Sequence, residues 1–203
     1  MSNSTVRNYL LAAKVHWPAR ERALLRRLQE LNNTKSRYRI VDVGCGPGLL
    51  LPGLKGLNFD YLGVDTDPDI IQYCKENFEN GSSVRFSDEE LSTIPGALSK
   101  SDIVVLNGVV HHLNDEQLKE LYEKLHRVRH LVILDHYRPL PQITFRYLVP
   151  FILQNLDRGK YVRLYNRFEV IPGFTRESSE VFPISFMGFR LWDYFCHYYK
   201  SSS

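Results

Sequence analysis

The sequence predicts an α/β fold: one doubly wound, mostly parallel sheet of seven strands, with helices on both faces and an antiparallel pair of strands near the C-terminus. Segments typical of strands alternate with segments of helical periodicity. The runs "IVVL" and "LVIL" are apolar at consecutive positions, as strands covered on both faces are. A glycine-rich turn, "GCGPG", follows the first predicted strand, where sheets of this kind bind ligands.

The N-terminal segment predicts two helices. Ser4 can cap the first, in which apolar residues recur at helical spacing. Pro18 suits the first turn of the second helix, which Asn32 and Asn33 end. The second helix carries an apolar stripe made of Leu24, Leu25, Leu28 and Leu31.

Strands and helices then alternate. Residues 37–44 predict a strand, and residues 48–57, after the glycine turn, predict a short, interrupted helix. The next strand is predicted over residues 59–65. Asp67 supplies an N-cap, and Pro68 a first-turn proline, for the helix that follows.

The pattern continues to the C-terminal part of the chain. Asn114 and Gln117 form a box-like start for a further helix. A long helix interrupted by Pro150 is expected over residues 143–156, and two closing strands joined near Gly188 over residues 180–199. Three more strands are predicted over residues 83–87, 102–110 and 130–135.

Composition excludes several classes of protein. The chain of 203 residues is 43% hydrophobic, which suits one domain, and its formal charge of +3 is too mild to require a polyanionic partner. Its three cysteines are widely scattered, which fits neither a disulfide framework nor a zinc site. No apolar run approaches the roughly 20 residues of a membrane span. Arg7 and Lys14 interrupt any signal-peptide segment, so a cytoplasmic protein is expected.

The glycine turn and the second strand together predict an adenosine-containing cofactor. Glycines at positions 44, 46 and 48 let the backbone approach a ligand closely. Asp65 ends the second strand about twenty residues on, where an acidic side chain can accept both ribose hydroxyls. A dinucleotide is the weaker interpretation, because Leu49 replaces the third fingerprint glycine and Pro47 would crowd a pyrophosphate.

Four segments in order, "DVGCGPG", "GVDTD", "SDEEL" and "LNGVVHHL", make the chain resemble the class I, Rossmann-like S-adenosylmethionine-dependent methyltransferases. The resemblance runs from about Arg39 to Asp135. The flanking segments resemble the small-molecule branch that includes quinone-biosynthesis-type enzymes. The resemblance implies S-adenosylmethionine as cofactor, S-adenosylhomocysteine as product, and methyl transfer to a small-molecule acceptor by in-line displacement.

The resemblance also implies roles for residues of the cofactor site. Asp42 would orient the cofactor's amino group or the glycine loop, and Asp65 would hold the ribose. Thr66 would flank the adenine, and Asp88 or Glu89 would accept a hydrogen bond from its amino group. Residues beside the methionyl part of the cofactor would be Gly44, Cys45, Gly46, Gly48, Asn107 and Val109.

The acceptor side is less specific. His111 and His112, just beyond the fourth strand, could take a proton from the acceptor, orient it, or merely shape the cofactor pocket. His136 and Tyr137 are a second candidate pair. Tyr9 and Trp17 belong to a helix that resembles the lid over cofactor and acceptor in many relatives. No metal site is predicted, because adjacent histidines rarely converge on one ion.

One domain is expected, with a helical lid over residues 1–37, a cofactor-binding core over 38–137, and substrate-side helices and closing strands over 138–203. Two other functions stay open: a cofactor-binding or protein-interaction module without catalysis, and RNA methylation through the basic segment from Arg138 to Arg176. DNA is not an expected partner, because "NGVV" stands where nucleic-acid amino methyltransferases carry an Asn- or Asp-Pro-Pro-aromatic motif. The sequence specifies neither the acceptor nor the oligomeric state.

Overall fold

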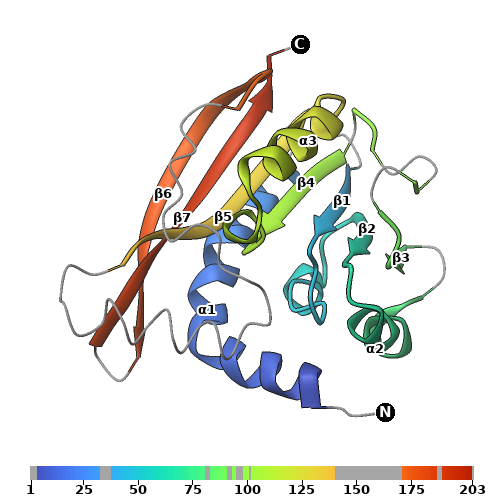
Figure 1. Cartoon of the computed structure of the whole chain (residues 1–203), viewed down its shortest axis with the longest axis vertical. Coiled ribbons are helices and arrows are strands. Elements are labelled where there is room, and N and C mark those ends of the chain that lie inside the picture. The colour runs from blue at the N-terminus through green and yellow to red at the C-terminus, as the bar shows by residue number, and fades with distance from the viewer. Residues whose placement is uncertain are drawn as a thin grey trace.

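Seven strands form one sheet in the order β3-β2-β1-β4-β5-β7-β6 (Figure 1). The computed structural model describes residues 4–32, 38–80, 83–90, 93–94, 98–100, 102–139, 171–186 and 189–202. β1 to β5 pair in parallel, whereas β7 pairs antiparallel with both β5 and β6. The predicted fold, including its antiparallel C-terminal pair, is confirmed. The strands are β1 (Tyr38–Val43), β2 (Phe59–Val64), β3 (Val84–Ser87), β4 (Asp102–Asn107), β5 (His130–Pro139), β6 (Phe174–Phe186) and β7 (Phe189–Ser201).

Helices cover both faces of the sheet. α1 (Ser4–Asn32) passes behind the strands in Figure 1, whereas α3 (Asp115–Leu125) lies in front of them. α2 (Pro68–Phe78) follows β2, and short 3-10 helices follow the glycine turn (η1, Leu51–Leu54) and β4 (η2, Val110–His112). Each face has its own core, one including α1 and α2 and the other including α3. This explains why the strand runs are apolar at consecutive positions.

The helix starts follow the predicted capping chemistry. The side chain of Asp67 accepts hydrogen bonds from the backbone N–H groups of Asp69 and Ile70 at the start of α2. At the start of α3, Asn114 and Gln117 form a reciprocal capping box. Both caps satisfy backbone donors that have no partner inside the helix.

The two predicted N-terminal helices are one helix in the structure, with Pro18 inside it, so this prediction was wrong. A proline removes one helical hydrogen bond and usually bends a helix. α1 changes direction along its length in Figure 1. Trp17 and Ala19, on either side of the proline, both pack against the same core, so tertiary packing keeps the helix continuous.

The strand predicted over residues 102–110 ends earlier, at Asn107. Gly108 has a φ of 75°, in the left-handed region, and its N–H donates to the carbonyl of Leu134. The chain then enters η2 in place of a longer strand. The helix predicted over residues 143–156 and the junction near Gly188 lie outside the described residues. In the described part of the chain, no helix is long and apolar enough to cross a membrane.

Candidate functional site

The glycine turn after β1 is held against the end of β2. The backbone N–H groups of Gly44 and Cys45 both donate to the carbonyl of Val64, at 2.7 and 3.0 Å. Gly44, Gly46 and Gly48 have φ values of 71°, 51° and 71°. Side chains with a Cβ rarely adopt this left-handed region, so the turn needs glycine at these positions.

We expect Gly44→Ala to lower the free energy of unfolding by about 2 kcal/mol more than Gly56→Ala does. Both glycines have positive φ values, 71° and 87°, so both substitutions carry the backbone cost. A Cβ on Gly44 would lie 2.4 Å from Cγ2 of Val109, whereas a Cβ on Gly56 would meet nothing within 4 Å. Urea unfolding of both variants measures the difference; equal losses would show that Val109 moves aside at no cost.

Asp65 ties the glycine turn to the start of α2. Its Oδ2 accepts a hydrogen bond from the N–H of Gly46 at 2.9 Å, and its Oδ1 accepts one from the N–H of Asp67 at 3.0 Å. Burial raises the pKa of Asp65 above its ordinary value, although these backbone donors oppose the rise. The carboxylate thus lies at the edge of the turn, where the sequence predicted a ribose partner.

Asp42 is a buried carboxylic acid on β1. Its side chain is 2% exposed, and its Oδ2 accepts a hydrogen bond from the hydroxyl of Tyr61 at 2.7 Å. Its Oδ1 has no hydrogen-bond partner among the residues that the structure describes. Burial raises the pKa of Asp42 from 3.8 to about 6, and the Tyr61 hydrogen bond only partly opposes this. An unpartnered buried oxygen of this kind suits a polar, preferably cationic, ligand group.

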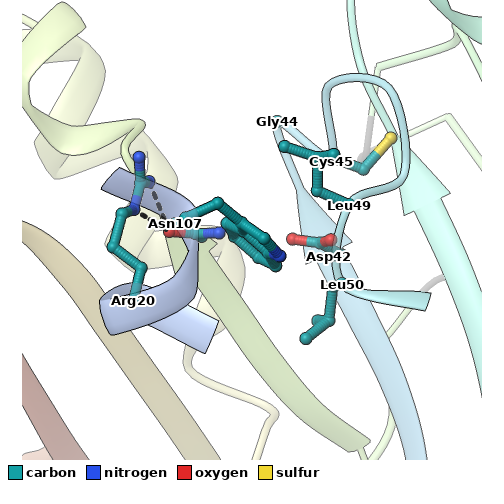
Figure 2. A pocket seen from close by; sticks show the side chains of 8 residues that line it. Arg20, Asp42, Gly44, Cys45, Leu49, Leu50 and Asn107 are labelled. Atoms are coloured by element: carbon teal, nitrogen blue, oxygen red, sulfur yellow. Dashed lines mark hydrogen bonds between the residues drawn. The ribbon is translucent and has the colours of Figure 1, made fainter. Parts of the chain in front are cut away.

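A pocket lies between α1 and the glycine turn (Figure 2). Figure 2 shows Asp42 on one side of it and Arg20 with Asn107 on the other. The Nε–H of Arg20 donates to Oδ1 of Asn107 at 3.2 Å, and a second guanidinium N–H donates to the same oxygen. The pocket lining therefore holds one carboxyl group and one guanidinium. Its lining is Trp17, Arg20, Asp42, Gly44, Cys45, Leu49, Leu50 and Asn107.

Arg20 is a site residue that the sequence analysis missed. It is only 6% exposed, and its guanidinium carbon lies 4.9 Å from the ring centroid of Tyr194. A signal was present, because Arg20 precedes Leu24 and Leu28 at intervals of four residues. A cation on the apolar stripe of a helix marks a buried charge that needs partners.

Of the remaining predicted cofactor residues, one lies over the glycine turn and three lie outside the pocket lining. Val109 lies over the glycine turn, since its Cγ2 would contact a Cβ on Gly44. Thr66, Asp88 and Glu89 are exposed and are not part of the pocket lining. The N–H of Asp65 donates to the carbonyl of Ser87 at 3.2 Å. The loop that begins at Asp88 therefore starts beside Asp65.

His111 is held by a buried carboxylate in the middle of β5, that of Asp135. Its Nδ1 lies 2.7 Å from Oδ1 of Asp135, and its backbone N–H donates to Oδ2 of the same residue at 3.1 Å. Both side chains are almost fully buried, at 2% and 0% exposed. Burial acts to raise the pKa of Asp135, but the charge and hydrogen bond of His111 outweigh it and lower this pKa to about 2. Asp135 is thus an anion at neutral pH.

Aromatic rings continue from His111 toward α1. The ring of His112 lies 3.9 Å from that of His111, and the ring of His136 lies 4.8 Å away. Tyr194 faces His136 across the β5–β7 pair, with its hydroxyl 3.2 Å from Nε2. Because Arg20 lies over Tyr194, this ring cluster adjoins the pocket. The structure thus brings His111, His112 and His136 together, whereas the side chains of Tyr9 and Tyr137 lie outside the described residues.

Ligand atoms of His111, Asp135 and His136 lie within 4.8 Å of one another, a spacing that could hold a metal ion. Both oxygens of Asp135, however, already accept hydrogen bonds from His111, and Oδ1 also accepts one from the N–H of His136. The described residues thus form a hydrogen-bonded cluster at this point. That the protein uses no metal stays a prediction.

Residues 40–130 match a family model described as a methyltransferase domain. They are a class I methyltransferase domain. The match begins in β1 and ends at the start of β5, so it contains the glycine turn, Asp65 and His111. The family resemblance predicted from four sequence segments is confirmed for this core of the chain.

Curated relatives of the methyltransferase domain act on different acceptors. The chain is 38% identical over 101 residues to the ribosomal protein L11 methyltransferase of Thermotoga neapolitana, covering 47% of this chain and 34% of that protein. It is 32% identical over 77 residues to the ubiquinone biosynthesis O-methyltransferase of Methylobacterium sp. (strain 4-46), covering 37% and 31%. The match thus spans about a third of the length of each of these relatives.

A solved structure with a similar fold is magnesium protoporphyrin IX methyltransferase from Synechocystis PCC 6803 with bound S-adenosylhomocysteine. The TM-score is 0.58 at 17% identity, and the superposition covers 90% of this chain and 82% of that one. At this identity the comparison shows that the methyltransferase fold extends over most of the chain.

Proposed function

We propose that this protein binds S-adenosylmethionine and transfers its methyl group to a small-molecule acceptor. The observation that carries the proposal is the pocket beside the glycine turn, whose lining holds the buried carboxyl of Asp42 on one side and the guanidinium of Arg20 on the other. The amino-acid part of the cofactor has an ammonium and a carboxylate, which need those two partners. The cofactor of the Synechocystis relative is consistent with this assignment.

The residues fit the cofactor part by part. Oδ1 of Asp42 would accept from the ammonium, and Arg20 would donate to the carboxylate. Asp65, already at the edge of the turn, would accept from the ribose hydroxyls. Asn107 and Val109 would flank the methionyl chain. Thr66 would flank the adenine, and either Asp88 or Glu89 would accept a hydrogen bond from its amino group. These exposed side chains follow the ends of β2 and β3.

The bound cofactor would supply an electrophilic methyl group, so the chain's main tasks are positioning and exclusion of water. α1 covers the pocket through Trp17 and Arg20, consistent with a lid. His111 or His112 would take a proton from the acceptor or orient it. His136, with Tyr9, Trp17 and Tyr137, would contribute to acceptor binding.

A small acceptor is our first candidate, because one relative of the chain is named a ubiquinone biosynthesis O-methyltransferase. The ubiquinone relative acts on a small molecule, whereas the relatives named for ribosomal protein L11 favour a protein acceptor as the second candidate. An assay with methyl-labelled S-adenosylmethionine separates the acceptor classes. The protein is offered a metabolite extract, ribosomal proteins or RNA in separate reactions. Label in the extract alone supports our proposal, and label in protein or RNA alone contradicts the small-molecule acceptor.

Calorimetric titration of the purified protein with S-adenosylmethionine and S-adenosylhomocysteine tests the cofactor directly. Binding of either ligand supports the proposal. Absence of binding of both to folded protein, checked by circular dichroism, would exclude it.

We expect Arg20→Gln to weaken S-adenosylhomocysteine binding about tenfold, equivalent to ~1.4 kcal/mol, because the variant loses a charged partner of the cofactor's carboxylate. Methylthioadenosine has the same nucleoside and thioether but no amino-acid group. Its affinity should therefore be unchanged by the substitution. Equal weakening of both ligands would mean that Arg20 acts only by holding α1 on Asn107.

A further inference from the structure

We propose that Asp135 is a positioning residue that fixes the His111 imidazole with its proton on Nδ1, so that Nε2 accepts the proton of the methyl acceptor. The inference rests on the proposed function and deepens it. It restricts the acceptor to a group that loses a proton on methylation, a hydroxyl or an N–H.

Asp135 forms two hydrogen bonds with His111. One carboxylate oxygen lies 2.7 Å from Nδ1, and the other accepts the backbone N–H of the same residue at 3.1 Å. A carboxylate can only accept, so the proton between the two side chains belongs to Nδ1. In the neutral ring the lone pair then lies on Nε2, as in other bases oriented by a buried carboxylate.

The surroundings keep Asp135 ionised while His111 gains and loses a proton. The N–H of His136 donates to Oδ1 of Asp135 at 2.7 Å, which adds a third hydrogen bond to the carboxylate. The other titratable groups whose rings contact His111 are His112 on η2 and His136 on β5. Tyr194 on β7 in turn contacts His136, and Arg20 on α1 lies over Tyr194. Asp135 is the anion among them that directly contacts the imidazole.

The location of His111 matches this role. It follows β4 by four residues, on the turn that begins at Gly108. Arg20 covers that turn, since its guanidinium nitrogen would lie 2.6 Å from a Cβ on Gly108. α1 therefore covers the start of the turn that carries His111, and a catalytic base needs only one reachable nitrogen when the lid admits an acceptor.

The proton step balances within the chain. The acceptor's O–H or N–H bond would break, its proton would pass to Nε2, and the electron pair would stay on the acceptor atom. That atom would use a pair for the new bond to the methyl carbon, whose bond to the cofactor's sulfur would break with its electron pair going to sulfur. His111 becomes an imidazolium paired with the Asp135 carboxylate. It returns the proton to solvent after the product leaves.

Labelling with diethylpyrocarbonate, which acylates unprotonated imidazole nitrogen, tests the proposal without a known acceptor. Full-length protein is treated between pH 5 and 9 and mapped by mass spectrometry. His126 is exposed and should react, whereas His130 is buried, at 5% exposed, and should not. The proposal requires α1 to admit an acceptor, so we expect His111 to react although it is less exposed than His130. Protection of His111 under conditions that label His126 would overturn the proposal.

Asp135→Asn should shift the midpoint of His111 labelling down by at least one pH unit, because the imidazolium loses its anionic partner. Asp102→Asn removes another buried carboxyl, paired with Arg39 at the opposite end of β4, and should leave the midpoint unchanged. An unmoved midpoint in the Asp135 variant would contradict the proposal.

If Asp135→Asn fails to fold, nitrogen-15 NMR of wild-type protein with labelled histidines shows which ring nitrogen of His111 carries the proton. A neutral His111 with its proton on Nδ1 supports the proposal, and one with its proton on Nε2 overturns it. Calorimetry with S-adenosylmethionine on the same preparation tests the proposed function separately. Absence of cofactor binding would exclude that function whatever the labelling result.

Discussion

Asp65→Ala is expected to weaken the binding of S-adenosylhomocysteine about 100-fold, equivalent to ~2.7 kcal/mol. The substitution removes the predicted acceptor of the ribose hydroxyls and also frees the N–H of Gly46, which now donates to this carboxylate at 2.9 Å. Hydrogen bonds to a charged group are worth about 1.5–3 kcal/mol each, so a loss of this size is reasonable. Calorimetric titration of wild type and variant measures it.

Asp67→Ala is the matched control for Asp65→Ala. Asp67 lies two residues away and also accepts backbone hydrogen bonds, but it caps α2 through Asp69 and Ile70. We expect this variant to lose about 1 kcal/mol of stability and little cofactor affinity. If the two variants weaken cofactor binding equally, Asp65 acts through the local backbone rather than through the ribose.

Asp42→Asn is expected to make the cofactor-free protein more stable than wild type by about 3 kcal/mol at pH 8 and by almost nothing at pH 4. The pKa of Asp42 is raised from 3.8 to about 6, chiefly by burial. The folded state therefore holds the proton more tightly, and wild-type stability falls as pH rises from about 4 to about 6. A pKa difference of about two corresponds to about 3 kcal/mol. Urea unfolding of both proteins at the two pH values measures this.

The same substitution should weaken cofactor binding, because the neutral amide that replaces the carboxylate cannot form an ion pair with the cofactor's ammonium. We expect wild-type binding at pH 6 to release about half a proton, since Asp42 is about half protonated there, and Asp42→Asn binding to release none. The dependence of the binding enthalpy on buffer ionisation detects the difference. Equal stability of the two proteins at pH 8 would show that Asp42 is not destabilised in the cofactor-free state. Equal cofactor affinity of wild type and Asp42→Asn would show that Asp42 does not bind the cofactor.

Asp65 and Asp42 differ in how far the folded protein satisfies their carboxyl oxygens before a ligand binds. Asp65 is satisfied by two backbone donors before any ligand arrives. Asp42 has one oxygen bonded to Tyr61 and the other without a partner among the described residues. A buried polar atom without a partner costs stability, and its presence beside the glycine turn is consistent with a ligand that supplies the missing interaction.

Much of the fold was predictable because its signals are local. The glycines at positions 44, 46 and 48 need positive φ values that other residues avoid. Asp67 and the Asn114–Gln117 pair bond to backbone groups two or three residues away. Asp65 was also predictable, because the end of a second parallel strand lies next to the first strand's turn in this fold.

By itself, the sequence determined the order of strands and helices, the glycine turn and the acidic residue beside it, because these depend on neighbouring residues and on apolar periodicity. Only the tertiary structure decided that α1 is continuous through Pro18, that Arg20 bonds to Asn107 across 87 positions, and that Asp135 holds His111. The physical reason is that such pairs form only after the sheet and its covering helix have packed, and no local pattern encodes which buried cation meets which oxygen.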